Sequence, residues 1–275
     1  MTASLTPDPS PLPPPPVKPE RIIDVHTHIF CDRSQVREQA KDRRILLEVA
    51  DHFGLEAFVV LPLFGGLHPT RGQIEAGNDA AADFAHQDSR VRPFATVYPP
   101  HGADALAELR RRLDDGFSGL KIWCSLADEP FMDPLMEAMR AYGKPALIHA
   151  LHKAGPHPEL AGGQYPLESR PVRIAALARR HPGTKIIMAH IGGDFLWSCD
   201  EIRDCPNVWT DISGTYCEQG SVEHAVETLG PNRVLFGSDL PGASFINNVA
   251  KVMAADLPDD QKDRILYLNA RELLG

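Results

Sequence analysis

The feature that most constrains the fold is a repeated alternation, from Arg21 onward, of a short apolar run with a helical pattern. We expect strands at residues 22–25, 57–61, 91–98, 119–123, 145–149, 185–190, 208–212 and 233–236. Near-continuous apolar runs of this length are typical of parallel strands covered by helices on both faces. Eight such units in about 250 residues match a (β/α)8 barrel, the TIM barrel, in number and in length.

An open, doubly wound sheet is the competing architecture. Such a sheet normally carries a glycine-rich phosphate loop after its first strand. Here the first apolar run leads into His26-Thr27-His28 instead. The sequence therefore predicts one α/β domain, a TIM barrel over residues 21–275. A proline-rich tail over residues 1–20, with four consecutive prolines at 13–16, precedes it and is expected to be disordered.

The composition excludes several classes of partner. With 28 basic and 37 acidic residues the net charge is −9, which argues against nucleic acid. The densest basic run, at 110–112, is expected on a solvated helix face. Five widely spaced cysteines without a CxxC pair favour reduced thiols, packed in the core rather than catalytic. Neither a signal peptide nor a membrane-spanning run is evident, so we expect a soluble, cytoplasmic protein without a membrane partner.

Polar residues fall at the ends of the predicted strands. In a TIM barrel the catalytic groups lie at the C-terminal ends of the strands. Reading those ends selects His26, His28, Lys121, His149, His190 and Asp239. The two imidazoles of His-x-His on a strand point to the same side, because side chains alternate with period two. Each residue alone is a weak signal, but together they predict a metal site.

Five segments in order, DVHTHIF, GLKIW, ALIHA, IIMAHIGG and VLFGSDLP, resemble the amidohydrolase superfamily. The resemblance covers residues 21–275 and is nearest to the amidohydrolase-related group of short TIM-barrel metal hydrolases. That group includes aminocarboxymuconate semialdehyde decarboxylase and several aromatic-acid decarboxylases. The motifs are specific for the superfamily and poorly specific for the substrate.

The resemblance implies roles for individual residues. His26 and His28 would be metal ligands, with His149 and Asp239 completing the site. His190 would bind a second metal or act beside a single one. Lys121 would either bridge two metals as a carboxylated lysine or serve as an inner hydrogen-bond donor or substrate clamp. The implied cofactor is one or two divalent ions, with Zn²⁺ favoured.

This ligand set predicts a hydrolase in which a metal-activated water attacks an amide, lactone or ester carbon of a small molecule. Asp239 would move the proton, and His190 would stabilise the developing oxyanion. One alternative is a metal-dependent decarboxylase or hydratase of an aromatic or unsaturated carboxylic acid, and another is an inactive barrel used as a binding module. A homo-oligomer is possible in each case. Candidate substrate contacts are Trp123 and, in or after the long loop at 150–168, His152, His157, Tyr165, Arg170 and Arg173.

Overall fold

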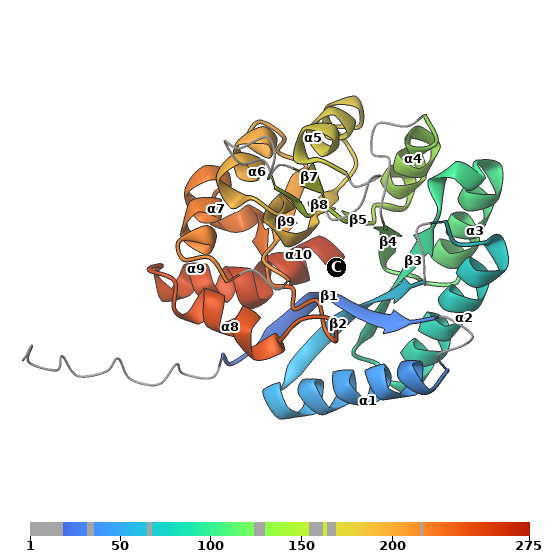
Figure 1. The fold of residues 1–275 in the computed structure, drawn as a ribbon, viewed down its shortest axis with the longest axis horizontal. Coiled ribbons are helices and arrows are strands. Elements are labelled where there is room, and N and C mark those ends of the chain that lie inside the picture. Colours follow the sequence, from blue (N-terminus) through green and yellow to red (C-terminus); the bar gives the residue numbers. More distant parts are fainter. Residues whose placement is uncertain are drawn as a thin grey trace, which may run out of the picture.

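One parallel sheet forms the centre of the molecule (Figure 1). The structure is a computed structural model that describes residues 19–31, 36–64, 68–123, 130–153, 162–163, 169–214 and 217–275. Within them the sheet runs in the order β1 (Ile22–Phe30), β2 (Leu55–Leu63), β3 (Val91–Val97), β4 (Gly119–Ile122), β5 (Ala146–Ile148), β8 (Ile186–Met188), β9 (Val208–Asp211) and β10 (Val234–Leu235). Every neighbouring pair is parallel.

The first and last strands meet and close the barrel. The Val25 amide donates to the Phe236 carbonyl at 3.0 Å, and the Asp239 amide donates to the His26 carbonyl at 2.7 Å. Leu240 forms an isolated parallel bridge with Thr27. The predicted TIM barrel is confirmed, and its seam lies beside the predicted metal ligands.

The helices surround the sheet as an outer ring (Figure 1). Their bounds are α1 (Val36–Phe53), α2 (Arg71–Gln87), α3 (Ala103–Asp114), α4 (Met132–Tyr142), α5 (Pro171–Arg180), α6 (Phe195–Ile202), α7 (Ser221–Leu229), α8 (Phe245–Met253), α9 (Asp259–Asp263) and α10 (Asn269–Leu274). A π-helical turn, Arg264–Leu268, lies between α9 and α10. Among the described residues, no helix combines the length and the apolar character that a membrane crossing requires.

The core has two apolar layers because successive strand residues point to opposite faces. In β5, Ile148 packs in the layer between strands and helices, whereas Leu147 packs inside the barrel. Ala270 and Leu273 of α10 join the interior layer, and Figure 1 shows α10 crossing the centre of the ring. Apolar side chains therefore fill the barrel beneath the C-terminal strand ends, where the polar residues gather.

Some predicted boundaries were wrong. Strand β2 continues through Pro62, which pairs with Ile29 of β1, although proline lacks the N–H that a ladder uses. Strand β8 stops at Met188, because His190 takes a left-handed backbone conformation, with φ at 61°. The predicted loop 150–168 contains a short antiparallel pair, β6 (His152–Lys153) with β7 (Gly162–Gly163).

In the basic run at 110–112, Arg110 and Arg111 are exposed as predicted, whereas the prediction of a solvated face is wrong for Arg112. The Arg112 side chain is 3% exposed, and its buried charge is paired with the carboxylates of Glu108 and Asp79. Three of the described cysteines are buried as predicted, whereas Cys217 is exposed. Cys124, His157, Tyr165 and the tail up to residue 18 lie outside the described residues.

Candidate metal centre

The predicted ligands gather at the C-terminal ends of the strands. His26 and His28 lie in β1 and Lys121 in β4. His149 follows β5 directly, His190 is the second residue after β8, and Asp239 is the fourth after β10. All are buried except Asp239, whose side chain is 23% exposed.

The tightest contacts join the two histidines of β1 to Asp239. The Nε2 atoms of His26 and His28 are 3.1 Å apart. Asp239 Oδ1 lies 2.9 Å from His28 Nε2 and 3.7 Å from His26 Nε2. One ligand atom each from His26, His190 and Asp239 all lie within 4.8 Å of one another. Nitrogen and carboxylate donors of this kind suit a divalent metal ion.

The hydrogen bonds behind the imidazoles test this fit. His26 Nδ1 lies 2.9 Å from the Asp211 carboxylate, and His28 Nδ1 lies 3.2 Å from the Leu61 carbonyl. Both partners are acceptors, so each Nδ1 carries the proton and each Nε2 presents a lone pair. Two lone pairs and the Asp239 carboxylate therefore face one another, an arrangement that needs positive charge between them. The residues present fit a bound cation.

Lys121 and Asp239 bring opposite charges to this cluster. The Lys121 ammonium, fully buried, lies 3.3 Å from His26 Nε2 and donates to it. Burial acts to raise the pKa of Asp239, but its contacts with His28, His190 and His26 outweigh burial and hold that pKa far below its usual range. The lysine contact matches an inner hydrogen-bond donor. Its carboxylation stays a prediction.

His190 and His149 form a second pair beside the first. His190 Nε2 lies 3.2 Å from His149 Nδ1, and the His149 ring lies against Trp123 with centroids 4.6 Å apart. Burial lowers the pKa of His149 to about 3 and that of His190 to about 4. Both rings are therefore neutral near pH 7, the state in which an imidazole can bind a metal.

Two residues that the sequence reasoning missed organise these histidines. Asp211, fully buried at the end of β9, accepts from His26 Nδ1 and, at 3.0 Å, from the His190 backbone amide. It also accepts from the Ser213 hydroxyl at 2.5 Å. Since that hydroxyl gives its one proton to the carboxylate, its oxygen accepts from His190 Nδ1, 2.9 Å away. His190 Nε2 consequently presents its lone pair.

The two missed residues differ in how visible they were. Asp211 ends the predicted strand at 208–212, so the criterion that selected the other ligands would have found it. Nothing in the sequence distinguishes Ser213. Arg170 is exposed just before α5 and Arg173 is half-buried in its first turn, and their roles toward a substrate stay predictions.

Asp24 fixes the seam on which the site is built. One of its carboxylate oxygens accepts from the backbone amides of His26 and Ser238, each at 3.0 Å. Burial raises the pKa of this carboxyl to about 7, although the bonds with Ser238 and His26 act against the shift. Asp24 thereby ties the ligand strand β1 to the segment that carries Asp239.

Comparison with known proteins places this geometry in a family. A family model described as amidohydrolase matches residues 23–275. No curated protein sequence matches. The structure of 2,6-dihydroxybenzoate decarboxylase from Rhizobium is 20% identical, covers 94% of this chain and 99% of its own, and has a TM-score of 0.73.

Two further solved structures are similar. For 5-carboxyvanillate decarboxylase from Sphingomonas paucimobilis the identity is 18%, the coverage is 92% of this chain and 98% of that one, and the TM-score is 0.71. Dihydroxybenzoic acid decarboxylase from Polaromonas sp. JS666, which holds manganese, is 17% identical and has a TM-score of 0.70. The match covers 92% of this chain and 96% of that one. At these identities the likeness shows the fold alone. The family model spans the barrel, and with it we conclude that the chain belongs to the amidohydrolase family.

Proposed function

We propose that this chain is a metal-dependent decarboxylase of a hydroxylated aromatic carboxylic acid. The observation that carries the proposal is the convergence of His26 Nε2, His28 Nε2 and Asp239 Oδ1, which suits a single divalent ion. Three similar structures, all of decarboxylases, favour this chemistry over the hydrolysis that the sequence suggested first.

The family and this cluster support a divalent metal cofactor. We place the ion between His26, His28 and Asp239, with His190 beside it. When bound, it would supply a Lewis-acidic charge that holds the anionic oxygens of the substrate. Zn²⁺ stays a prediction, and manganese in a similar decarboxylase makes Mn²⁺ the other candidate.

Asp239 is the residue to which we assign proton transfer. Decarboxylation breaks the bond between the ring carbon and the carboxylate, leaves the electron pair on the ring carbon and releases CO2, so that carbon must gain a proton. Because its pKa is low, Asp239 begins as a carboxylate. It takes up a proton, and we propose that the substrate hydroxyl is the source of that proton. It then delivers that proton to the ring carbon. Its 23% exposure makes it more accessible to a substrate than the fully buried His26.

His190 has a different task in this scheme. Because its Nδ1 proton is directed to Ser213, the neutral ring presents an acceptor at Nε2, where His149 Nδ1 lies 3.2 Å away. We assign His190 the task of orienting a substrate hydroxyl that takes the place of this contact. Stabilisation of an oxyanion, the role predicted from the sequence, would require a second proton on the ring. Trp123, whose ring is tilted by 56° against that of His149, offers an aromatic surface for a flat substrate.

A direct assay tests the proposal. The purified protein is stripped of metal, reloaded with Mn²⁺ or Zn²⁺, and supplied with 2,6-dihydroxybenzoate and 5-carboxyvanillate, and CO2 release is measured. A parallel panel of amides, lactones and esters reports hydrolysis. We expect metal-dependent CO2 release. Hydrolysis without CO2 release would return the assignment to a hydrolase, and failure to bind either metal would point to an inactive barrel.

A further inference from the structure

We propose that Lys251 is a positioning residue for His190, acting through the backbone on either side of Ser213. Lys251 lies on α8, outside the barrel strands and 39 residues after Ile212, the first residue of the segment that it contacts. The expected effect on kcat rests on the proposed function, whereas the expected effect on the position of the His190 imidazole does not.

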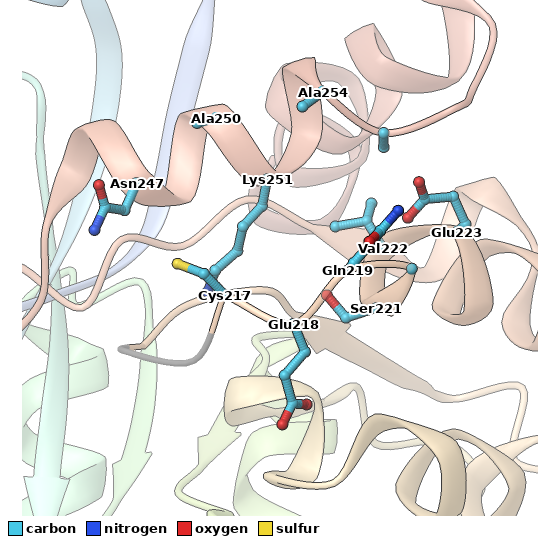
Figure 2. Close-up of a pocket in the computed structure, with 12 residues that line it drawn as sticks. Cys217, Glu218, Gln219, Ser221, Val222, Glu223, Asn247, Ala250, Lys251 and Ala254 are labelled. Carbon is cyan, nitrogen blue, oxygen red and sulfur yellow. The ribbon is translucent and has the colours of Figure 1, made fainter. Parts of the chain in front are cut away.

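The ammonium of Lys251 is fully engaged. Its Nζ lies 3.0 Å from the Ile212 carbonyl, 3.2 Å from the Gly214 carbonyl and 2.8 Å from Asn248 Oδ1. A lysine has three N–H donors, and here three acceptors receive them. Figure 2 shows the side chain running from α8 to the segment that follows β9.

The two bound carbonyls flank the serine that contacts His190. Ser213 Oγ is 2.9 Å and its carbonyl oxygen 3.4 Å from His190 Nδ1. A Cβ added at Gly214 would lie 3.1 Å from the same nitrogen, so a residue without a side chain leaves room for the ring here. Its φ of +105° is a conformation that glycine adopts without strain. A shift of this backbone would therefore move both the acceptor and the wall beside the imidazole.

Lys251 also lines two cavities, which raises ligand binding as the competing role. The larger cavity, of about 490 Å³, lies between α7 and α8 and includes Cys217, Glu218 and Glu223 in its lining (Figure 2). The smaller, of about 20 Å³, is lined by His190, Ser213 and Lys251 among others. Because all three protons of the amine are directed to protein acceptors, Lys251 has no donor left for a ligand. Its contacts favour the positioning role.

The chemistry of the residue supports the same role. Burial lowers the pKa of Lys251, so placing a cation here costs solvation that apolar packing would avoid. Lys251→Met removes this solvation cost but leaves the Ile212 and Gly214 carbonyls and Asn248 Oδ1 without their donor, which costs stability of its own. A second variant, Lys251→Gln, keeps a donor at this position, so the two variants together separate loss of position from loss of fold.

The test compares Lys251→Met with Lys262→Met. Lys262 donates to one helix carbonyl, that of Met253 at 3.0 Å, and serves as the matched control. The readout is the Nδ1–H signal of His190 in ¹⁵N-histidine-labelled full-length protein, assigned by its absence from His190→Gln. We expect Lys251→Met to speed exchange of this proton with water at least tenfold and to shift the signal, and Lys262→Met to leave both unchanged.

Activity gives the second readout. With an active substrate from the panel above, we expect kcat of Lys251→Met to fall about 10- to 100-fold with KM nearly unchanged, as for a misplaced catalytic group. If the variant does not fold, Lys251→Gln, which keeps a polar head, should give a smaller change of the same kind. A His190 signal identical to wild type would overturn the proposal. Altered exchange in a protein that never releases CO2 would uphold it and reject the proposed function instead.

Discussion

A buried polar network near α3 and the candidate metal cluster differ in how their donors and acceptors are matched. The first joins α2, β3 and α3 through Asn78, Thr96, Glu108 and Arg112. Asn78 donates to Glu108 at 2.9 Å and accepts from the Thr96 amide at 2.9 Å, while Arg112 donates to Glu108 at 2.7 Å. Each of these donors meets an acceptor. Such a network satisfies its buried groups without any outside partner.

The metal cluster is arranged differently. His26 Nε2, His28 Nε2 and Asp239 Oδ1 are brought together as acceptors, and the Lys121 ammonium donates to the first of them. The Nδ1 protons of the two histidines point outward to Asp211 and to a backbone carbonyl. His190 and Asp239 also have left-handed backbones, with φ of 61° and 62°. For residues other than glycine this costs about 1–3 kcal/mol each. The difference teaches that polar burial alone does not identify a site, whereas unbalanced acceptors on a strained backbone do.

The largest expected effect breaks the metal cluster. In His26→Ala combined with His28→Ala we expect no bound metal and no activity, with the fold retained because barrel stability resides in the apolar layers. Metal content is measured by elemental analysis and folding by circular dichroism. His52→Ala combined with His86→Ala, two exposed helix-end histidines, is the control. Wild-type metal content in the first variant would show that the ligands lie elsewhere.

Removing only the proton acceptor should have the next largest effect. Asp239→Asn keeps the size and one oxygen but cannot take up a proton, so we expect kcat to fall by about 10² to 10⁴. Metal content is measured on the same sample. Asp79→Asn changes a carboxylate of the other cluster and should leave kcat within about twofold. With metal retained, a kcat for Asp239→Asn within about threefold of wild type would move the proton transfer to His190.

The reciprocal change breaks the satisfied network. Arg112→Met removes the buried arginine that bonds to Glu108 and leaves that carboxylate with Arg111 and Asn78, and we expect the free energy of unfolding to fall by about 3 kcal/mol. Urea titration followed by circular dichroism measures it. Metal affinity and kcat should stay near wild type. Loss of metal in this variant would mean that the two clusters are coupled, contrary to the comparison.

The smallest expected effect concerns pH. The pKa of His190 falls on folding from 6.5 to about 4, so between these values the unfolded chain binds a proton that the folded chain lacks. Metal-free protein should therefore lose stability on acidification through this window. His190→Gln removes the titrating group. We expect the free energy of unfolding of this variant to change less steeply with pH than that of wild type, by up to ~1.4 kcal/mol per pH unit. Parallel curves for both proteins would contradict this assignment.

The fold and much of the candidate site could be read from the chain alone. Apolar runs report burial on both faces of a strand, and the residue after each run reports the strand end. That information placed His26 and His28 at the end of the first predicted strand, which the structure extends to Phe30, Lys121 within another strand and His149 at the end of a third. It failed at Arg112, whose burial depends on acids from two helices that the sequence does not show to be adjacent.

Only the tertiary structure decided which ring nitrogen of each histidine carries the proton and which presents a lone pair to the site. Asp211 and Ser213 set the ring nitrogen that carries the proton in His26 and His190, and Lys251 reaches the same segment from α8. These partners are distant along the chain and meet because the strands close into a ring. The sequence by itself determined the barrel and the types of donor at its strand ends, since both follow from local pattern. The orientation of those donors depends on hydrogen bonds between distant segments, which no local pattern records.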